Sequence, residues 1–192
     1  MSGLEKNLDR ALAEIQSQLV VPVIIGYMLR GLEPYDDIAE YTMEDMIGSM
    51  WPDSALLTIA FSAKQIADHN AHLPMLSALG IEASRVIASY APLWVAHSHG
   101  ESADGDEIRS LLTNIPEDLE ALADLLDASS VALVDTTSAA GPLCELLGSQ
   151  ALAHKSFAEY KLDTMGILES EIRFNDGRED GSNVIAFPGK HH

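Results

Sequence analysis

Residues 142–174 read PLCELLGSQALAHKSFAEYKLDTMGILESEIRF, and this pattern predicts one long amphipathic helix. Gly141 marks a break before it, and Pro142 suits the first turn of a helix, where its missing N–H is not needed. Apolar side chains recur at three- and four-residue spacing and share one broad face. They are Leu143, Leu146, Leu147, Ala151, Phe157, Ala158, Met165, Leu168 and Ile172. Other helices must cover a face this wide, so the stretch predicts an all-α, bundle-like domain with one long C-terminal helix.

Polar residues interrupt this apolar face near its middle. His154 lies on the face itself, with Gln150 one turn before it and Lys161 two turns after it. A buried imidazole needs a hydrogen-bond partner, so His154 is interpreted either as a satisfied core residue or as part of a ligand site between helices. Both interpretations stay open at this point. Gln150, His154 and Lys161 are therefore candidate ligand-binding residues.

The composition is that of an acidic globular protein. Thirty acidic and 11 basic residues give the 192-residue chain a formal net charge of -19, and 47% of its residues are hydrophobic. This charge repels phosphate backbones and anionic lipid headgroups, so direct binding to nucleic acid is not expected. It suits a cytoplasmic protein that must stay dispersed, and it also matches a basic partner.

The single cysteine and the longest apolar run bear on the compartment. Cys144 cannot form an intrachain disulfide, and its place beside the apolar face favours a core thiol in a reducing compartment. The apolar run at residues 19–29 contains Pro22 and is well short of the roughly 20 residues that span a membrane. We therefore expect no transmembrane span. The charged residues upstream do not fit a secretory signal, so a cytoplasmic location is predicted.

The rest of the chain predicts shorter helices separated by glycine and proline. They cover residues 36–50, 53–72, about 74–91, 108–112, 116–128 and 129–140, after a first helix that begins near residue 3. Pro22 is expected to kink or end the first helix. Pro92 is expected to end the helix at about residues 74–91. In residues 116–128 leucines face inward, and the acids expected to face outward are Glu117, Asp118, Glu120, Asp124 and Asp127. Residues 1–174 are thus expected to form one α-helical domain.

Residues 53–72 have a wide apolar arc and a narrow polar strip opposite it. The strip consists of Thr58, Ser62, Gln65, His69 and His72. Two imidazoles three residues apart can share a metal or a substrate, so His69 and His72 are candidate ligand-binding residues. They also suit solvent or a subunit interface. No further ligand can be assigned beside them, so no metal site is predicted.

Residues 175–192 differ in composition from the rest of the chain. A flexible polar linker is predicted first, followed by an apolar tail peptide. Val184, Ile185 and Phe187 are more hydrophobic than an ordinary linker, which makes them candidate partner-docking residues; a frayed terminus is the alternative.

No motif in the sequence names a reaction. The serine nucleophile elbow, the P-loop, the dinucleotide GxGxxG and the zinc CxxC are absent, as is the Glu-x-x-His pair of di-iron carboxylate bundles. Two classes of function therefore remain. The first is an acidic cytoplasmic interaction protein, an adaptor or regulator that binds a protein partner or itself. The second is a small-molecule or metal-binding bundle, an enzyme included, with a site around His154 or around His69 and His72. No cofactor is predicted.

Overall fold

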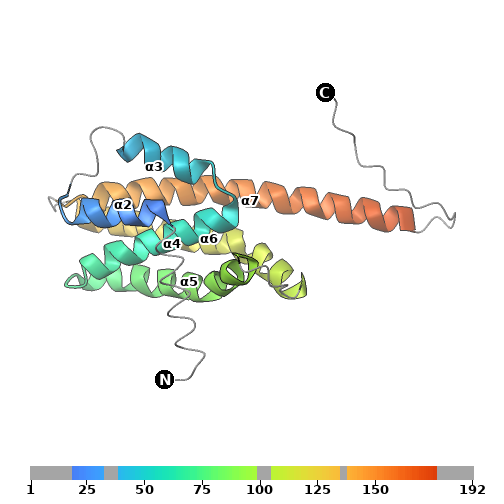
Figure 1. Cartoon of the computed structure of the whole chain (residues 1–192), viewed down its shortest axis with the longest axis horizontal. Helices are drawn as coiled ribbons and strands as arrows, with labels where there is room; N and C mark the ends of the chain where they lie inside the picture. The colour runs from blue at the N-terminus through green and yellow to red at the C-terminus, as the bar shows by residue number, and fades with distance from the viewer. Residues whose placement is uncertain (1–18, 33–38, 99–104, 135–137, 177–192) are drawn as a thin grey trace, which may run out of the picture. The chain divides into compact units, whose positions relative to one another are not determined.

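A computed structural model describes residues 19–32, 39–98, 105–134 and 138–176 (Figure 1). Within these ranges the regular elements are helices and there is no β-strand, which confirms the predicted all-α class. The elements in order are α2 (Val20–Leu29), α3 (Ala39–Gly48), α4 (Pro52–His69), the 3-10 turn η1 (Pro74–Leu76), α5 (Ser77–Ser98), α6 (Gly105–Leu133) and α7 (Ala140–Asp176).

Internal contacts divide the chain into two units, Met1–Glu159 and Tyr160–His192. The first unit contains α2 to α6 and the first part of α7, together with the described hydrophobic core. The second unit begins within α7. The predicted first helix upstream of Leu19 and the tail peptide at residues 177–192 lie outside the described residues.

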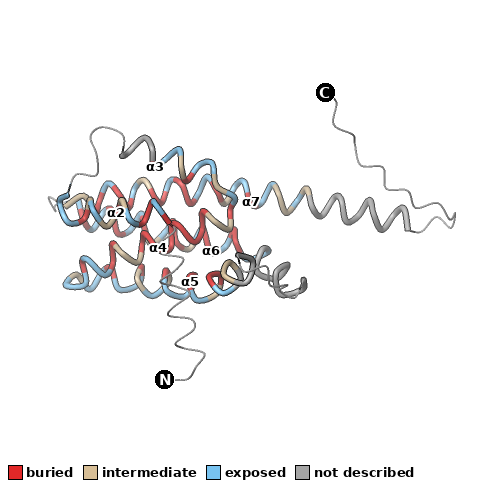
Figure 2. Tube along the Cα trace, in the orientation of Figure 1, coloured by how far each residue is buried: buried red, intermediate tan, exposed pale blue. Residues whose placement is uncertain are grey.

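The central helix of the first unit is α4. It packs against α5 and α2 and also contacts α6 and α3, and buried residues crowd along it (Figure 2). Thr58 and Ser62 are fully buried, so their expected place on an outward polar strip is wrong. Their hydroxyls are satisfied nearby, because Ser62 Oγ donates to the Thr58 carbonyl at 2.7 Å and Thr58 Oγ1 donates to Met50 Sδ at 3.4 Å. Short hydroxyl side chains on a helix can be buried in this way, so α4 is covered even along part of its polar side.

The ends of α2 follow from a proline and a glycine. Pro22 lies in the first turn of α2, where its missing N–H costs little, and the helix continues beyond it to Leu29. Gly31 follows the last turn with a φ of 68°, a left-handed conformation that glycine adopts without strain. None of the helices in the described ranges has the length and apolar character needed to cross a membrane.

Two further prolines lie inside helices. Helix α5 continues through Pro92 to Ser98, and α6 continues through Pro116, joining residues that were expected to form separate helices. The predicted helix end at Pro92 is therefore wrong. A proline inside a helix costs about 3 kcal/mol, but apolar side chains on both sides of Pro92 pack on the same core, among them Tyr90 and Trp94. Their burial offsets the lost hydrogen bond.

The first part of α7 lies close against α6 at Gly148. A Cβ atom on Gly148 would lie 3.5 Å from Cβ of Leu126 and 3.7 Å from the carbonyl oxygen of Ala123. Both distances are ordinary van der Waals contacts, so the two helices approach each other to within the size of a methyl group at this position. Leu147 and Ala151, on either side of Gly148, are fully buried. This close contact joins α7 to the core of the first unit.

Candidate functional site

His154 is buried where α7 meets the last turn of α3. Its side chain is 4% exposed, and its Nε2 lies 2.8 Å from the carbonyl oxygen of Ile47. A carbonyl oxygen can only accept, so Nε2 carries the proton and donates it. The other ring nitrogen, Nδ1, is buried and has no hydrogen-bond partner in the described part of the chain. The hydrogen bond ties α3 to α7 across 107 residues of sequence.

Gln150 shares this buried region. Its side chain is 7% exposed, and a Cβ atom on Gly48 would lie 3.8 Å from its Oε1. The structure therefore brings Gln150 and His154 together against the C-terminal end of α3. Lys161, the third candidate of this group, belongs to the second unit. Burial of both side chains favours the core interpretation of His154, because a ligand would have little access to them.

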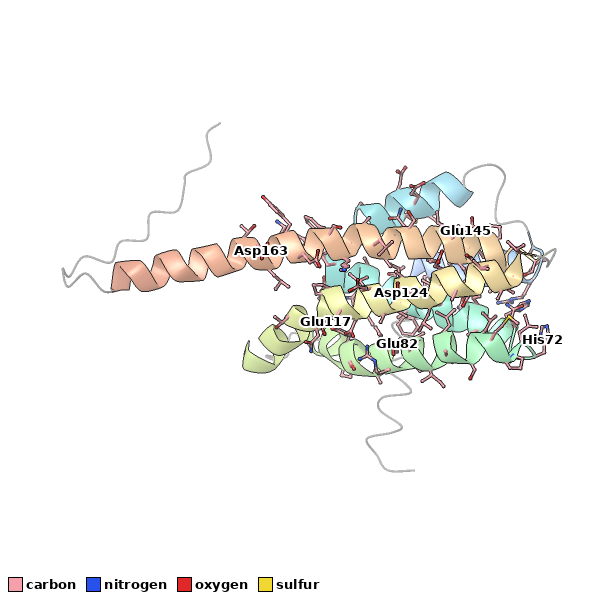
Figure 3. The ribbon with its side chains drawn as sticks, turned by 180° about the vertical axis from the view of Figure 1, so that it is seen from behind. His72, Glu82, Glu117, Asp124, Glu145 and Asp163 are labelled. Atoms are coloured by element: carbon pink, nitrogen blue, oxygen red, sulfur yellow. The ribbon has the colours of Figure 1, made fainter. Side chains whose placement is uncertain are left out.

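His69 and His72 line one hollow at the C-terminal end of α4. Figure 3 labels His72. Both histidines are exposed, and the hollow has a volume of about 430 Å³. The remaining lining residues come from the end of α2, from the loop after α4 and from the two residues before α7: they are Met28, Leu29, Gly31, Asn70, Leu73, Ser138 and Ala139. The structure thus places the two candidate histidines beside apolar and amide groups. Such a hollow could hold a small organic molecule with one polar end.

Metal binding finds no further support from the geometry. Among the residues that the structure describes, no three His, Cys, Asp or Glu side chains lie close enough together to hold a metal ion. Within the part of the chain that the structure describes, His69 and His72 are the two candidate ligands at the hollow, and stable transition-metal sites use three or four.

A polar network between α5 and α6 was missed by the sequence analysis. Asp118 accepts a hydrogen bond from Tyr90 Oη at 2.6 Å and an ion-paired hydrogen bond from Arg85, which also pairs with Glu82 at 2.6 Å. Asp118 is 8% exposed, so its expected outward orientation is wrong. A signal was present, because Asp118 lies four residues before Leu122 and falls inside the apolar arc of its helix.

This network gives one prediction about alkaline pH. Burial, and then the hydrogen bond to Asp118, raise the pKa of the Tyr90 hydroxyl above its ordinary value of 10.0. A raised folded-state pKa stabilises the protein fully below the unfolded pKa, and this stability is lost as pH rises toward the folded pKa. We therefore expect the free energy of unfolding to fall more steeply above about pH 10 in the wild type than in Tyr90→Phe. Urea denaturation of both proteins at about pH 8 and about pH 11 tests this, and parallel losses would contradict it.

Cys144 is a core residue, as expected. Its side chain is fully buried, and burial raises the pKa of the thiol to about 12. A thiol of this kind is almost entirely protonated at neutral pH and is a poor nucleophile. Its burial therefore favours a packing role for Cys144.

The candidate docking residues Val184, Ile185 and Phe187 lie outside the described residues. The fold and site geometry define the class only as an all-α helical domain. No protein-family model matches the chain, no curated protein matches it, and no solved structure matches it.

Proposed function

We propose that this chain is an acidic cytoplasmic interaction protein, an adaptor or regulator, that binds another protein through an exposed aromatic pair. The pair consists of Trp51, immediately before α4, and Phe157 on α7. Trp51 is 64% exposed and Phe157 is 38% exposed, and their ring centroids lie 6.4 Å apart. Exposed aromatic side chains in mutual contact are typical of the residues that contribute most to protein–protein affinity.

Hydrogen bonds hold the backbone next to this aromatic pair in place, and this supports a binding role. The His154–Ile47 hydrogen bond and the Thr58–Met50 hydrogen bond both anchor the segment that leads into Trp51. A surface held in this way loses little conformational entropy when a partner binds, so more of the contact energy remains as affinity.

The charge of the protein indicates the kind of partner. A formal charge of -19 repels a second copy of the same chain, nucleic acid and anionic lipid at long range. A basic protein is instead attracted, and electrostatic complementarity raises its association rate. We therefore assign the aromatic pair to a basic protein partner.

A site-specific photocrosslinker tests this proposal. It is placed at Trp51 and, as a matched control, at Ile81 on α5, which is 68% exposed. We expect a basic protein to crosslink from position 51 and not from position 81. That protein, once purified, should bind Trp51→Ala at least about tenfold more weakly than the wild type, while Ile81→Ala binds normally. Crosslinking to a second copy alone, or the same products from both positions, would overturn the proposal.

The hollow at His69 and His72 favours a second candidate function, binding of a small molecule. Its volume of about 430 Å³ lies in the range of small-ligand pockets. A thermal-shift screen of metabolites tests this: a ligand that raises the melting temperature of the wild type and not of His69→Ala or His72→Ala would establish the site. A screen in which every stabilising compound acts equally on all three proteins would reject it.

A further inference from the structure

The exposed side of α6 carries an ordered series of residues. Six exposed side chains follow one another at alternating spacings of three and four, so they lie on one strip of the helix. They are Glu117, Glu120, Asp124, Asp127, Val131 and Val134. We call this series the α6 strip. Its first four residues are acidic, and we call them the acidic half of the strip. Its last two, Val131 and Val134, are aliphatic, and we call them the apolar half.

The acidic half of the α6 strip is largely uncompensated. Glu120 pairs with Lys155 Nζ of α7 at 2.7 Å. Asp124 lies close enough to the same Lys155 to interact with its charge, while Glu117 and Asp127 form no salt bridge with any side chain in the described ranges. Like charges at three- and four-residue spacing destabilise a helix slightly, so cations placed along this strip would relieve repulsion. Figure 3 labels Glu117 and Asp124 on α6.

The apolar half of the α6 strip leads to a hollow. Val131 is 69% exposed and Val134 is 71% exposed, so two aliphatic side chains one turn apart face solvent at this end of the strip. Val134 lines a hollow of about 280 Å³ between the end of α6 and the start of α7, together with Leu133, Pro142 and others. Glu145 of α7 also lines it and adds one more carboxylate at this end.

We propose that the α6 strip binds a basic amphipathic helix of a partner protein. Lys and Arg side chains of that helix lie on the acidic half, and an aliphatic side chain enters the hollow beside Val134. A helix fits because its own side chains repeat at the same three- and four-residue spacing as the strip. Nucleic acid and anionic lipid carry the wrong charge, and a second copy of this chain carries the same net charge of -19. The α6 strip shares no residue with the Trp51–Phe157 pair, so the two surfaces are tested separately.

Binding of synthetic peptides to the full-length protein tests the proposal. The probes are two labelled helical peptides of about 20 residues. Each carries lysines along one half of a single helical face and leucines along the other half. The lysines are N-terminal to the leucines in one peptide and C-terminal to them in the other. We expect at least one of them to bind in a fluorescence polarisation assay. A control peptide in which the leucines are replaced by serine should bind at least about tenfold more weakly.

Charge reversal on the protein locates the site. Asp124→Lys combined with Asp127→Lys should weaken peptide binding at least about tenfold. The matched control is Glu44→Lys with Asp45→Lys on α3, which changes the net charge of the protein by the same amount at exposed positions. The control should weaken binding by less than about threefold. Circular dichroism of each variant confirms that the helices are intact.

The apolar half needs its own variant. Val134→Asp should weaken binding of the leucine-containing peptide, while Val20→Asp at an exposed position of α2 should not. If the two charge-reversed double variants weaken peptide binding equally, the peptide is attracted by the net charge of the protein and not by the α6 strip, and the proposal is overturned. Failure of both peptides to bind would overturn it as well. A wild-type dimer that Val134→Asp dissociates would assign the strip to a second copy and reject the basic helix.

Discussion

Replacing His154 with alanine is expected to lower the free energy of unfolding by about 2 to 3 kcal/mol. The substitution removes a buried imidazole that fills space between α7 and α3, and it removes the side-chain donor to the carbonyl oxygen of Ile47, which keeps only the hydrogen bond from the Met50 N–H. Both losses act on the same contact, so the attachment of α3 to α7 should weaken most. Urea denaturation followed by circular dichroism measures the change.

His154→Leu separates the two contributions. Leucine restores most of the lost volume but cannot donate to Ile47, so we expect it to recover part of the stability and remain about 1 kcal/mol below the wild type. A different result would change the role of His154. If His154→Ala keeps the melting temperature of the wild type and removes binding of a ligand or partner, His154 is a site residue and its burial is relieved when the protein functions.

Replacing Asp118 with alanine is expected to cost about 2 to 3 kcal/mol. Asp118 is buried, and both of its carboxylate oxygens accept hydrogen bonds, one from Tyr90 and one from Arg85. Most of the effect should come from Tyr90, which is 5% exposed, because the Arg85 side chain is 49% exposed and water screens its charge. Urea denaturation of the single variants and of the double variant with Tyr90→Phe gives the coupling between the two residues.

Glu82→Ala is the matched control for this prediction. Glu82 pairs with the same Arg85, but within one helix and toward solvent, so its removal should cost less than about 1 kcal/mol. If Asp118→Ala and Glu82→Ala have equal effects, the network contributes as an ordinary surface ion pair, and the buried Tyr90–Asp118 hydrogen bond adds nothing.

The helical class and much of the core could be predicted because they depend on a short-range period. Leu147, Ala151 and His154 share one side of a helix whatever it packs against, and all three are buried. The helix boundary at Pro92 could not be predicted from the local sequence. Proline lowers the stability of a helix locally, but Tyr90 and Trp94 pack on a core that is built from distant parts of the chain. The candidate histidines at the end of α4 could be predicted as a pair, but the hollow beside them could not, because its other walls come from the end of α2 and from the residues just before α7.

By itself the sequence determined the helical period, the acidic charge and the inward place of His154, because each depends on the identity and spacing of neighbouring residues. Only the tertiary structure decided that Thr58 and Ser62 are buried, that Asp118 pairs with Tyr90 and Arg85, that His154 donates to Ile47, and that Trp51 meets Phe157. A helical wheel treats each helix as having one covered side. In the folded chain α4 is covered by several helices, and polar side chains on it are buried where a nearby group accepts their hydrogen bonds, as the Thr58 carbonyl does for Ser62.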